Sequence, residues 1–158
     1  MSFKILDCTL RDGGYYTDWK FNPKLVKLLV KTLDNNGVDI IELGYKSPVI
    51  GGPYRKCNDG FISSIIDFKI KANLAFMIDV KDYIIDGKVN EPLIKDIIKP
   101  STVFKICRVA AKYNEIHYIP QIVKILQNLG YDVICNLMAI SKVLDVEITE
   151  YIKTTKNL

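Results

Sequence analysis

The stretch ILDCTLRDGGYYTDW, residues 5–19, joins an apolar run to a charged pair, Arg11 and Asp12, and then to two glycines. An arginine guanidinium presents a fixed fork of donors that suits a carboxylate or an enolate oxygen. An aspartate offers a hard oxygen ligand that suits Mg²⁺ or Mn²⁺. Gly13 and Gly14 would let the chain bend sharply after a strand and approach a ligand closely. A plain turn with a surface ion pair would use the same residues, so both interpretations stay open at this point.

Five apolar runs predict β-strands. They are rich in Ile, Val and Phe and barely alternate with polar residues, which is typical of parallel strands buried on both faces. Their starts lie about 30–35 residues apart, the length of one strand with its crossover helix. The five runs are residues 3–10, 38–45, 73–79, 103–110 and 132–140.

Amphipathic segments between the runs predict helices. The first has Asn22 as its predicted N-cap, Pro23 in its first turn and Gly37 beyond its end. Its apolar stripe is predicted to be Leu25, Leu28, Leu29 and Leu33. Further helices are predicted within residues 58–71, 90–99, 114–131 and 145–158, and Pro120 indicates a kink or a helix start near residue 118.

Alternating strands and helices predict an α/β fold with a parallel sheet, and the chain, residues 1–158, shows no linker that would divide it into domains. Two architectures fit the pattern. A doubly wound open sheet of five strands would be complete at this length. A (β/α)₈ barrel needs about 250 residues, so only its first five units would be present. Periodicity alone favours the open sheet.

Charged and polar residues follow or interrupt every predicted strand. Besides Arg11 and Asp12, they are Glu42, Asp79, Lys105, Arg108 and Asn136. An unpaired buried charge costs several kcal/mol, so such groups pair with each other, bind a metal or face a wet cleft. Ligands bind at the carboxyl ends of strands in open sheets and in barrels alike. We therefore expect a ligand site at this edge, although each residue alone could equally be a solvated strand end or a structural ion pair.

Composition excludes several classes of protein. Hydrophobic residues make up 49% of the chain and charged residues 25%, which is typical of a globular protein. The net charge of +4 comes from scattered lysines, which argues against nucleic acid as a partner. No apolar run reaches the roughly 18 residues of a membrane span, and no secretory signal is evident. Four cysteines without a CxxC pair predict a reducing, cytoplasmic location, and those in apolar runs predict buried thiols.

The string LDCTLRDGG resembles the first-strand signature of a superfamily of metal-dependent aldolase and acyltransferase barrels. That superfamily includes 4-hydroxy-2-oxovalerate aldolase, hydroxymethylglutaryl-CoA lyase and the isopropylmalate synthases. GVDIIELGYKSP (37–48), FKICRVAA (104–111) and GYDVICNLMAIS (130–141) look like its second, fourth and fifth strands. The resemblance covers nearly the whole chain and implies the first five units of a TIM barrel.

The resemblance also implies an activity, the cleavage or joining of C–C bonds beside a 2-oxo acid such as pyruvate. Arg11 would be the catalytic arginine that steadies the enolate, Asp12 a ligand to the divalent metal, Mg²⁺ or Mn²⁺, and Glu42 an orienting polar group. Asp79, Arg108 and Asn136 would line the same mouth and contact substrate.

Two departures from the superfamily pattern weaken this expectation. The superfamily completes its metal site with an H-x-H pair, whereas the only histidine here is His117, in a predicted helix. Asp12 alone cannot hold a metal tightly. The aldolase branch also has a histidine base shortly after R-D-G, where this chain has Tyr15 and Tyr16. Tyr15 is a poor base at neutral pH but a usable proton donor.

A rival interpretation follows from the five units. The first and fifth strands of an incomplete barrel are open edges that invite pairing with another chain, and the inner face leaves an apolar patch. The chain would then be an inactive truncated remnant, an assembly module or one half of a split enzyme. In each case we expect self-association or a complementing chain.

Overall fold

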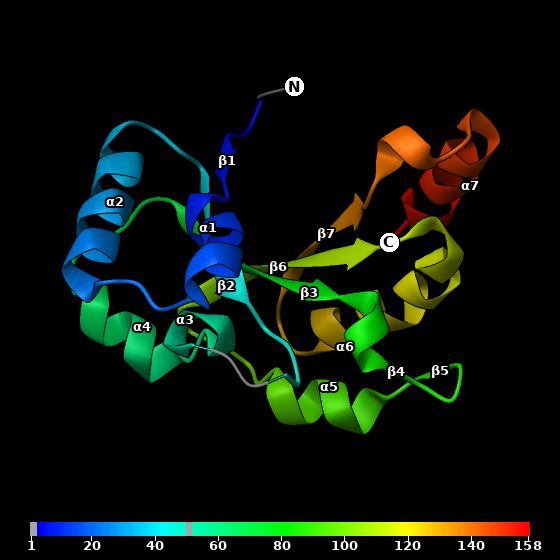
Figure 1. Ribbon diagram of the computed structural model, residues 1–158, viewed down its shortest axis with the longest axis horizontal. Coiled ribbons are helices and arrows are strands. Elements are labelled where there is room, and N and C mark those ends of the chain that lie inside the picture. The colour runs from blue at the N-terminus through cyan, green and yellow to red at the C-terminus, as the bar shows by residue number, and fades with distance from the viewer. Residues whose placement is uncertain (1–2, 50–51) are drawn as a thin grey trace. The chain divides into compact units, whose positions relative to one another are not determined.

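The computed structural model describes residues 3–49 and 52–158 (Figure 1). The chain forms two compact units, one running to Met77 with Ser101–Ile106 added, the other made of Ile78–Pro100 and Cys107–Leu158. Strands β3 and β6 contribute residues to each unit.

The first unit contains, in chain order, β1 (Leu6–Asp7), α1 (Thr9–Thr17), α2 (Pro23–Asn35), β2 (Ile40–Tyr45), α3 (Pro53–Lys56), α4 (Asp59–Ile65) and the first parts of β3 (Asn73–Asp79) and β6 (Phe104–Ala111). The second unit contains the ends of β3 and β6, η1 (Val80–Tyr83), β4 (Ile84–Ile85), β5 (Lys88–Val89), α5 (Glu91–Ile97), η2 (Tyr113–Tyr118), α6 (Ile119–Asn128), β7 (Asp132–Leu137), η3 (Ile140–Lys142) and α7 (Asp145–Thr155).

The strand order of the main sheet is β1-β2-β3-β6-β7, which follows the order along the chain. β1 pairs parallel to β2, and β2 parallel to β3. A doubly wound sheet reverses its strand order at a switch point, so the open-sheet alternative is wrong. The chain is an α/β protein with a sequential sheet, and this order agrees with the barrel alternative.

The first predicted strand is much shorter than expected. Strand β1 covers only Leu6–Asp7, and helix α1 begins at Thr9 and includes Arg11 and Gly14. The Asp7 carboxylate accepts hydrogen bonds from the Thr9 backbone N–H at 3.1 Å and from Thr9 Oγ1 at 2.9 Å, which turns the chain into the helix. The sharp glycine bend predicted after the strand is therefore wrong, because both glycines are helical.

Helix α2 confirms the predicted ends but not the predicted apolar stripe. Asn22 caps it by accepting from the Lys24 N–H at 2.9 Å, and Gly37 beyond its end has φ +79°. The buried positions are Val26, Val30 and Asp34, whereas the expected stripe residues Leu25 and Leu28 are exposed. Helix α2 packs against α4 (Figure 1), so the leucine spacing alone does not set its buried face.

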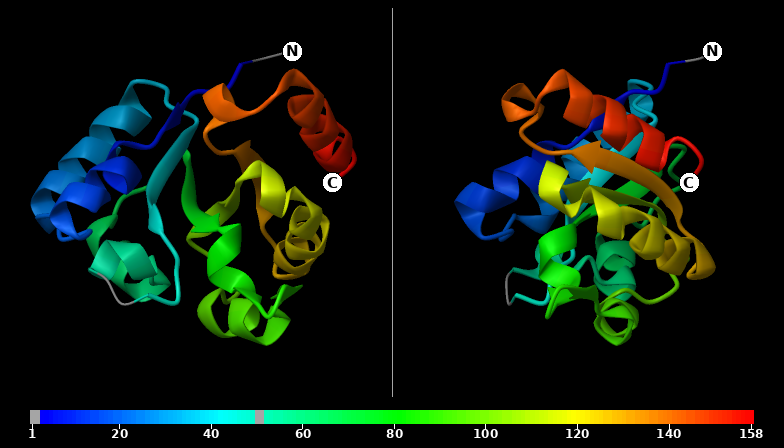
Figure 2. Two further views of the ribbon diagram at one scale, coloured as in Figure 1. Left: turned by 45° about the vertical axis from the view of Figure 1, so that its right-hand side comes forward. Right: turned by 90° about the vertical axis from the view of Figure 1, so that its right-hand side faces the viewer.

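Pro120 marks a helix start, as the sequence predicts. Helix α6 begins at Ile119, directly after η2, which also packs against α7 (Figure 2, yellow and red). The β4–β5 hairpin was not predicted, although its Asp86-Gly87 turn is a recognised hairpin signal. Both turn residues have positive φ, 51° and 70°.

Buried apolar side chains fill both units. In the first, the largest fully buried ones are Ile41, Leu43, Tyr54, Ile62 and Phe76; in the second they are Ile78, Tyr83, Ile94, Ile98, Ile119, Ile122 and Leu126. Cys57 and Cys107 are buried, but Cys8 and Cys135 are partly exposed, which corrects the expectation that thiols in apolar runs are buried. Within residues 3–49 and 52–158, no helix is long and apolar enough to cross a membrane.

Candidate active site

Arg11 is the centre of a charged cluster that joins helix α1 to strand β2. Its Nε donates to Glu42 Oε1 at 2.7 Å, and its Nη1 donates to Asp12 Oδ1 at 2.5 Å. The Glu42 side chain is fully buried, that of Arg11 is 13% exposed and that of Asp12 is 56% exposed. The structure thus brings together the three residues that the sequence singled out first.

The third nitrogen of the Arg11 fork has a different environment. Nη2 makes no hydrogen bond with the described residues, and it is not completely buried. A guanidinium held by two carboxylates with one nitrogen open is preorganised to donate to a ligand oxygen.

The cluster has two carboxylates for one guanidinium. Burial lowers the pKa of Arg11, but the hydrogen bond to Glu42 and the charges of Glu42 and Asp12 outweigh burial and raise that pKa above its usual value. Arg11 therefore stays charged. The second carboxylate, Asp12, is more than half exposed, so solvent screens its charge.

Cys8 is a fourth member of the cluster, and it was not among the predicted site residues. Its Sγ donates to Asp12 Oδ2 at 3.2 Å. Burial and this hydrogen bond raise the pKa of the Cys8 thiol. A thiol with a raised pKa is a poor nucleophile, so Cys8 orients the Asp12 carboxylate here and does not attack substrate.

Helix α1 is fixed against β2 by Trp19. The Trp19 side chain is 3% exposed, and its ring stacks on Tyr45 with centroids 6.1 Å apart. A Cβ on Gly14 would lie 2.1 Å from Trp19 Nε1, so only glycine leaves room for the indole under α1. Trp19 also has φ +51°, a strained value for a large side chain. The signal for this arrangement was the lone tryptophan five residues after Gly14.

Tyr15 lies on the exposed side of α1. Its ring meets Trp19 edge to face at 4.8 Å and is 61% exposed. Its hydroxyl makes no hydrogen bond with the described residues. The predicted role of Tyr15 as a proton donor stays a prediction.

The remaining predicted site residues belong to the second unit. Asp79 accepts from the Lys81 backbone N–H at 3.2 Å and pairs with Lys81 Nζ at 2.9 Å, so it caps η1. Arg108 Nη2 donates to Asn136 Oδ1 at 3.2 Å, which joins β6 to β7. Their predicted contact with substrate stays a prediction.

The described residues do not form a complete metal site. Among them, no group of three His, Cys, Asp or Glu side chains could hold a metal ion. Asp12 could give one ligand, but both its oxygens already accept hydrogen bonds, from Arg11 and from Cys8. His117 is exposed in η2 with its ring on Tyr118, as expected of a surface histidine. A divalent metal therefore does not fit the described residues alone.

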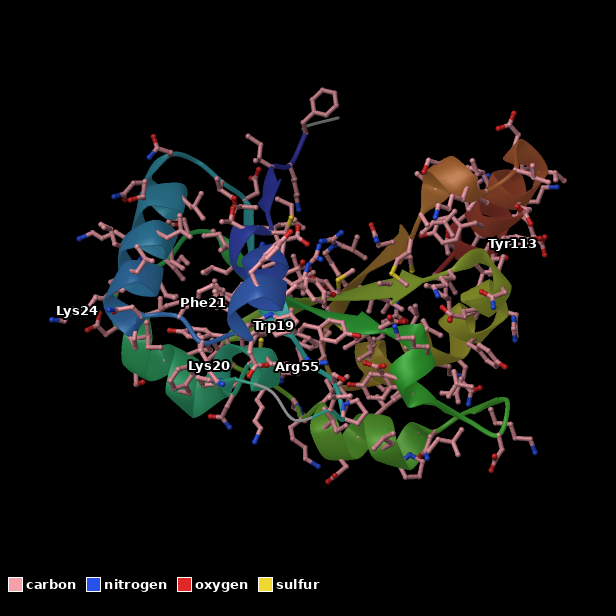
Figure 3. All side chains as sticks on the ribbon, in the orientation of Figure 1. Trp19, Lys20, Phe21, Lys24, Arg55 and Tyr113 are labelled. Atoms are coloured by element: carbon pink, nitrogen blue, oxygen red, sulfur yellow. The ribbon has the colours of Figure 1, made fainter. Side chains whose placement is uncertain are left out.

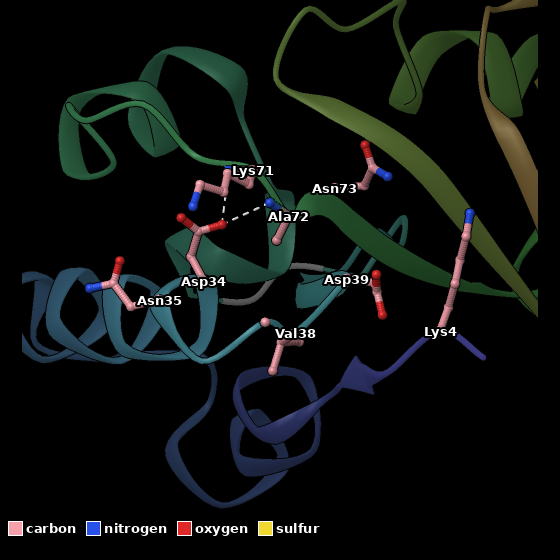
Figure 4. A pocket seen from close by; sticks show the side chains of 9 residues that line it. Lys4, Asp34, Asn35, Val38, Asp39, Lys71, Ala72 and Asn73 are labelled. Atoms are coloured by element: carbon pink, nitrogen blue, oxygen red, sulfur yellow. Dashed lines mark hydrogen bonds between the residues drawn. The ribbon is translucent and has the colours of Figure 1, made fainter. Parts of the chain in front are cut away.

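A cavity of about 410 Å³ lies at the amino ends of β1, β2 and β3, away from the strand ends that lead to α1 (Figure 4). Its acidic groups already have structural partners. Asp34 Oδ1 accepts from the backbone N–H groups of Lys71 and Ala72, each at 2.8 Å, and Asp39 Oδ2 accepts from that of Ile5 at 2.7 Å. These bonds hold the starts of the strands together.

No protein-family model matches the sequence, and no curated protein matches it. Among solved structures, the chain is similar to a crystal structure described as "the N-terminal domain of a putative aldolase" from Bacteroides vulgatus. The TM-score is 0.72 at 23% sequence identity, over 98% of this chain and 60% of that chain. At this identity the likeness shows the fold. The chain has an aldolase-like fold and spans 60% of the length of the chain it matches.

Proposed function

We propose that this chain forms the N-terminal part of a (β/α)₈ barrel of the aldolase and lyase type, which cleaves or joins C–C bonds beside the carbonyl of a 2-oxo acid. The observation that carries the proposal is the arrangement of Arg11, held by Glu42 and Asp12 with Nη2 making no hydrogen bond to the described residues. The aldolase-like fold and the sequential sheet support it.

In this proposal Arg11 is the group that stabilises the enolate. In the cleavage direction, the hydroxyl of the departing fragment gives its proton to water and becomes a carbonyl. The electron pair of the broken C–C bond then forms the enolate of the 2-oxo acid, and Nη2 donates a hydrogen bond to the oxygen that gains charge. Glu42 fixes the plane of the guanidinium. Tyr15 is the proposed donor of the proton that the enolate carbon later takes up.

A divalent metal, Mg²⁺ or Mn²⁺, is proposed only for an assembly in which further ligands come from outside the described residues. Asp12, whose side chain is 56% exposed, would be one of its ligands. No step of the proposal depends on the metal.

The proposal predicts that Arg11 binds pyruvate. At constant ionic strength, saturation-transfer NMR should detect pyruvate on the wild-type chain, and Arg11→Gln should weaken binding at least about tenfold, since a charge-assisted hydrogen bond contributes roughly 1.5–3 kcal/mol. Lys24→Gln, which removes one exposed positive charge from α2, is the matched control and should bind as wild type. Binding is measured because the missing H-x-H pair predicts no appreciable turnover by this chain alone.

The pyruvate experiment can contradict the proposal in two ways. An equal loss of pyruvate binding in Arg11→Gln and Lys24→Gln would show that binding depends only on the net charge of the chain. A wild-type chain that binds no pyruvate at tens of millimolar, with or without Mg²⁺, would remove Arg11 as a 2-oxo acid site.

A second candidate function is assembly, and the surface of η3 and α7 favours it. Ile140, Leu144, Val146 and Ile152 are 54–69% exposed there, and α7 buries no side chain. We expect the chain to self-associate at micromolar concentration, and Val146→Glu to reduce the mass measured by light scattering, whereas Lys153→Glu should not. A stable wild-type monomer in that measurement would exclude self-association.

A further inference from the structure

Arg55, on the short helix α3, is held by two aromatic rings. Its guanidinium carbon lies 4.8 Å from the centroid of the Trp19 ring and 5.3 Å from that of the Tyr45 ring. Figure 3 shows Trp19 and Arg55 close together. Trp19 and Tyr45 are only 3% and 6% exposed, so this Trp19–Tyr45 platform is rigid. Tyr45 is the last residue of β2, which places Arg55 at the carboxyl end of that strand.

The donors of Arg55 have no acceptor in the part of the chain that the structure describes. Its Nε is buried without a partner, and neither a hydrogen bond nor an ion pair engages the other nitrogens. These terminal nitrogens are not among the buried unpartnered atoms, so they reach the surface of a half-buried side chain. The guanidinium therefore has a fixed orientation and open donors.

Acidic residues that neighbour the platform in sequence are engaged elsewhere. Asp18, beside Trp19, pairs with Lys20 Nζ at 3.1 Å. Asp59, four residues after Arg55, accepts from Ser101 Oγ at 2.7 Å and from the Thr102 N–H at 3.2 Å. Neither carboxylate neutralises Arg55.

Packing alone accounts for only part of this arrangement. A cation over aromatic rings contributes about 0.5–2 kcal/mol, and the stem of a long side chain often covers apolar surface. A buried N–H without an acceptor, such as that of Nε, costs about 1–3 kcal/mol. A lysine stem would cover the two rings equally well without this cost. The planar guanidinium of Arg55 is needed only if a ligand accepts hydrogen bonds from it.

We propose that Arg55 on the Trp19–Tyr45 platform is a binding site for the oxyanion of a small-molecule ligand, either a phosphate or a carboxylate. Both groups present two oxygens that match a guanidinium fork. The site lies at the carboxyl end of β2, where ligands of parallel α/β folds bind. It is separate from the pairing of Arg11 with Glu42, and it does not depend on C–C bond chemistry.

Trp19 is the single tryptophan of the chain, so it reports on this site directly. We would titrate inorganic phosphate and, separately, acetate at constant pH and ionic strength, and follow Trp19 fluorescence and its one indole N–H resonance. A saturable change in both signals is expected with at least one anion. Phosphate alone would indicate a phosphorylated ligand, and acetate would indicate a carboxylate.

The variants separate a fixed guanidinium from general charge. Arg55→Gln should weaken binding of the anion at least about tenfold. Arg55→Lys, which keeps the charge without the planar guanidinium, should weaken binding less. Lys56→Gln, on the adjacent exposed residue, should bind as wild type. If Arg55→Gln loses its dispersed amide spectrum, Arg55→Lys decides. No saturable change with either anion, or equal losses in the Arg55 and Lys56 variants, would overturn the proposal.

Discussion

Gly14→Ala should destabilise the protein by at least about 2 kcal/mol. The added Cβ would lie 2.1–2.3 Å from Nε1, Cδ1 and Cε2 of the Trp19 indole, and overpacking of a buried site costs about 1–3 kcal/mol or more. The indole must leave its place, so the fluorescence of Trp19 should shift to the red. Urea unfolding of the variant measures the loss of stability.

Gly13→Ala is the matched control within the same helix. Its Cβ would meet only the Phe21 ring, at 3.8 Å, so there is room. Because alanine is a better helix former than glycine by about 1 kcal/mol, this variant should be neutral or slightly more stable than wild type. Adjacent glycines should thus respond with opposite sign.

A double variant isolates the cause. Combined with Trp19→Ala, which by itself should cost about 3–5 kcal/mol, Gly14→Ala should add no further loss. If Gly14→Ala is as harmful without the indole as with it, the close contact to Trp19 does not explain the glycine.

The sequence could predict the strands of the main sheet because their signal is local. The run at residues 73–79 coincides with β3, and Asn22 and Pro23 define the start of α2 as expected. The order of the strands in the sheet has no such local signal in the sequence. Periodicity could not separate an open sheet from a barrel, and only the sequential pairing of β1, β2 and β3 decides that question.

The ends of helices and strands were harder to predict, because tertiary contacts override the local conformational preference of the residues. The two glycines after Asp12 were predicted to form a bend. Instead, the Asp7 side chain starts a helix that includes them, and Trp19 occupies the space beside Gly14. The pairing of Arg11 with Glu42 joins residues 31 apart, so strand-end position could only suggest it. Arg55 gave no sequence signal, since its site exists only through the Trp19–Tyr45 platform.

Glu42→Ala should have a much larger effect on stability than Asp12→Ala, although both residues pair with Arg11. Glu42 is fully buried, so its removal leaves the half-buried guanidinium without its inner partner, and breaking a buried pair in this way costs about 3–5 kcal/mol. Asp12 is 56% exposed, and an exposed pair contributes under about 1 kcal/mol. Chemical unfolding of the two variants under the same conditions gives the comparison.

Replacing Arg11 and Glu42 by apolar residues tests whether this ion pair serves stability or ligand binding. Arg11→Met combined with Glu42→Leu should recover part of the stability lost in Glu42→Ala, because apolar side chains of similar size often replace a buried ion pair at little cost. The same double variant removes the guanidinium and should bind no pyruvate. Recovered stability with lost binding would mean that the charged pair is retained for its ligand and not for the fold. If Glu42→Ala and Asp12→Ala instead cost equally little, Glu42 does not hold Arg11 in place, and the preorganised guanidinium on which the proposed function rests would have to be abandoned.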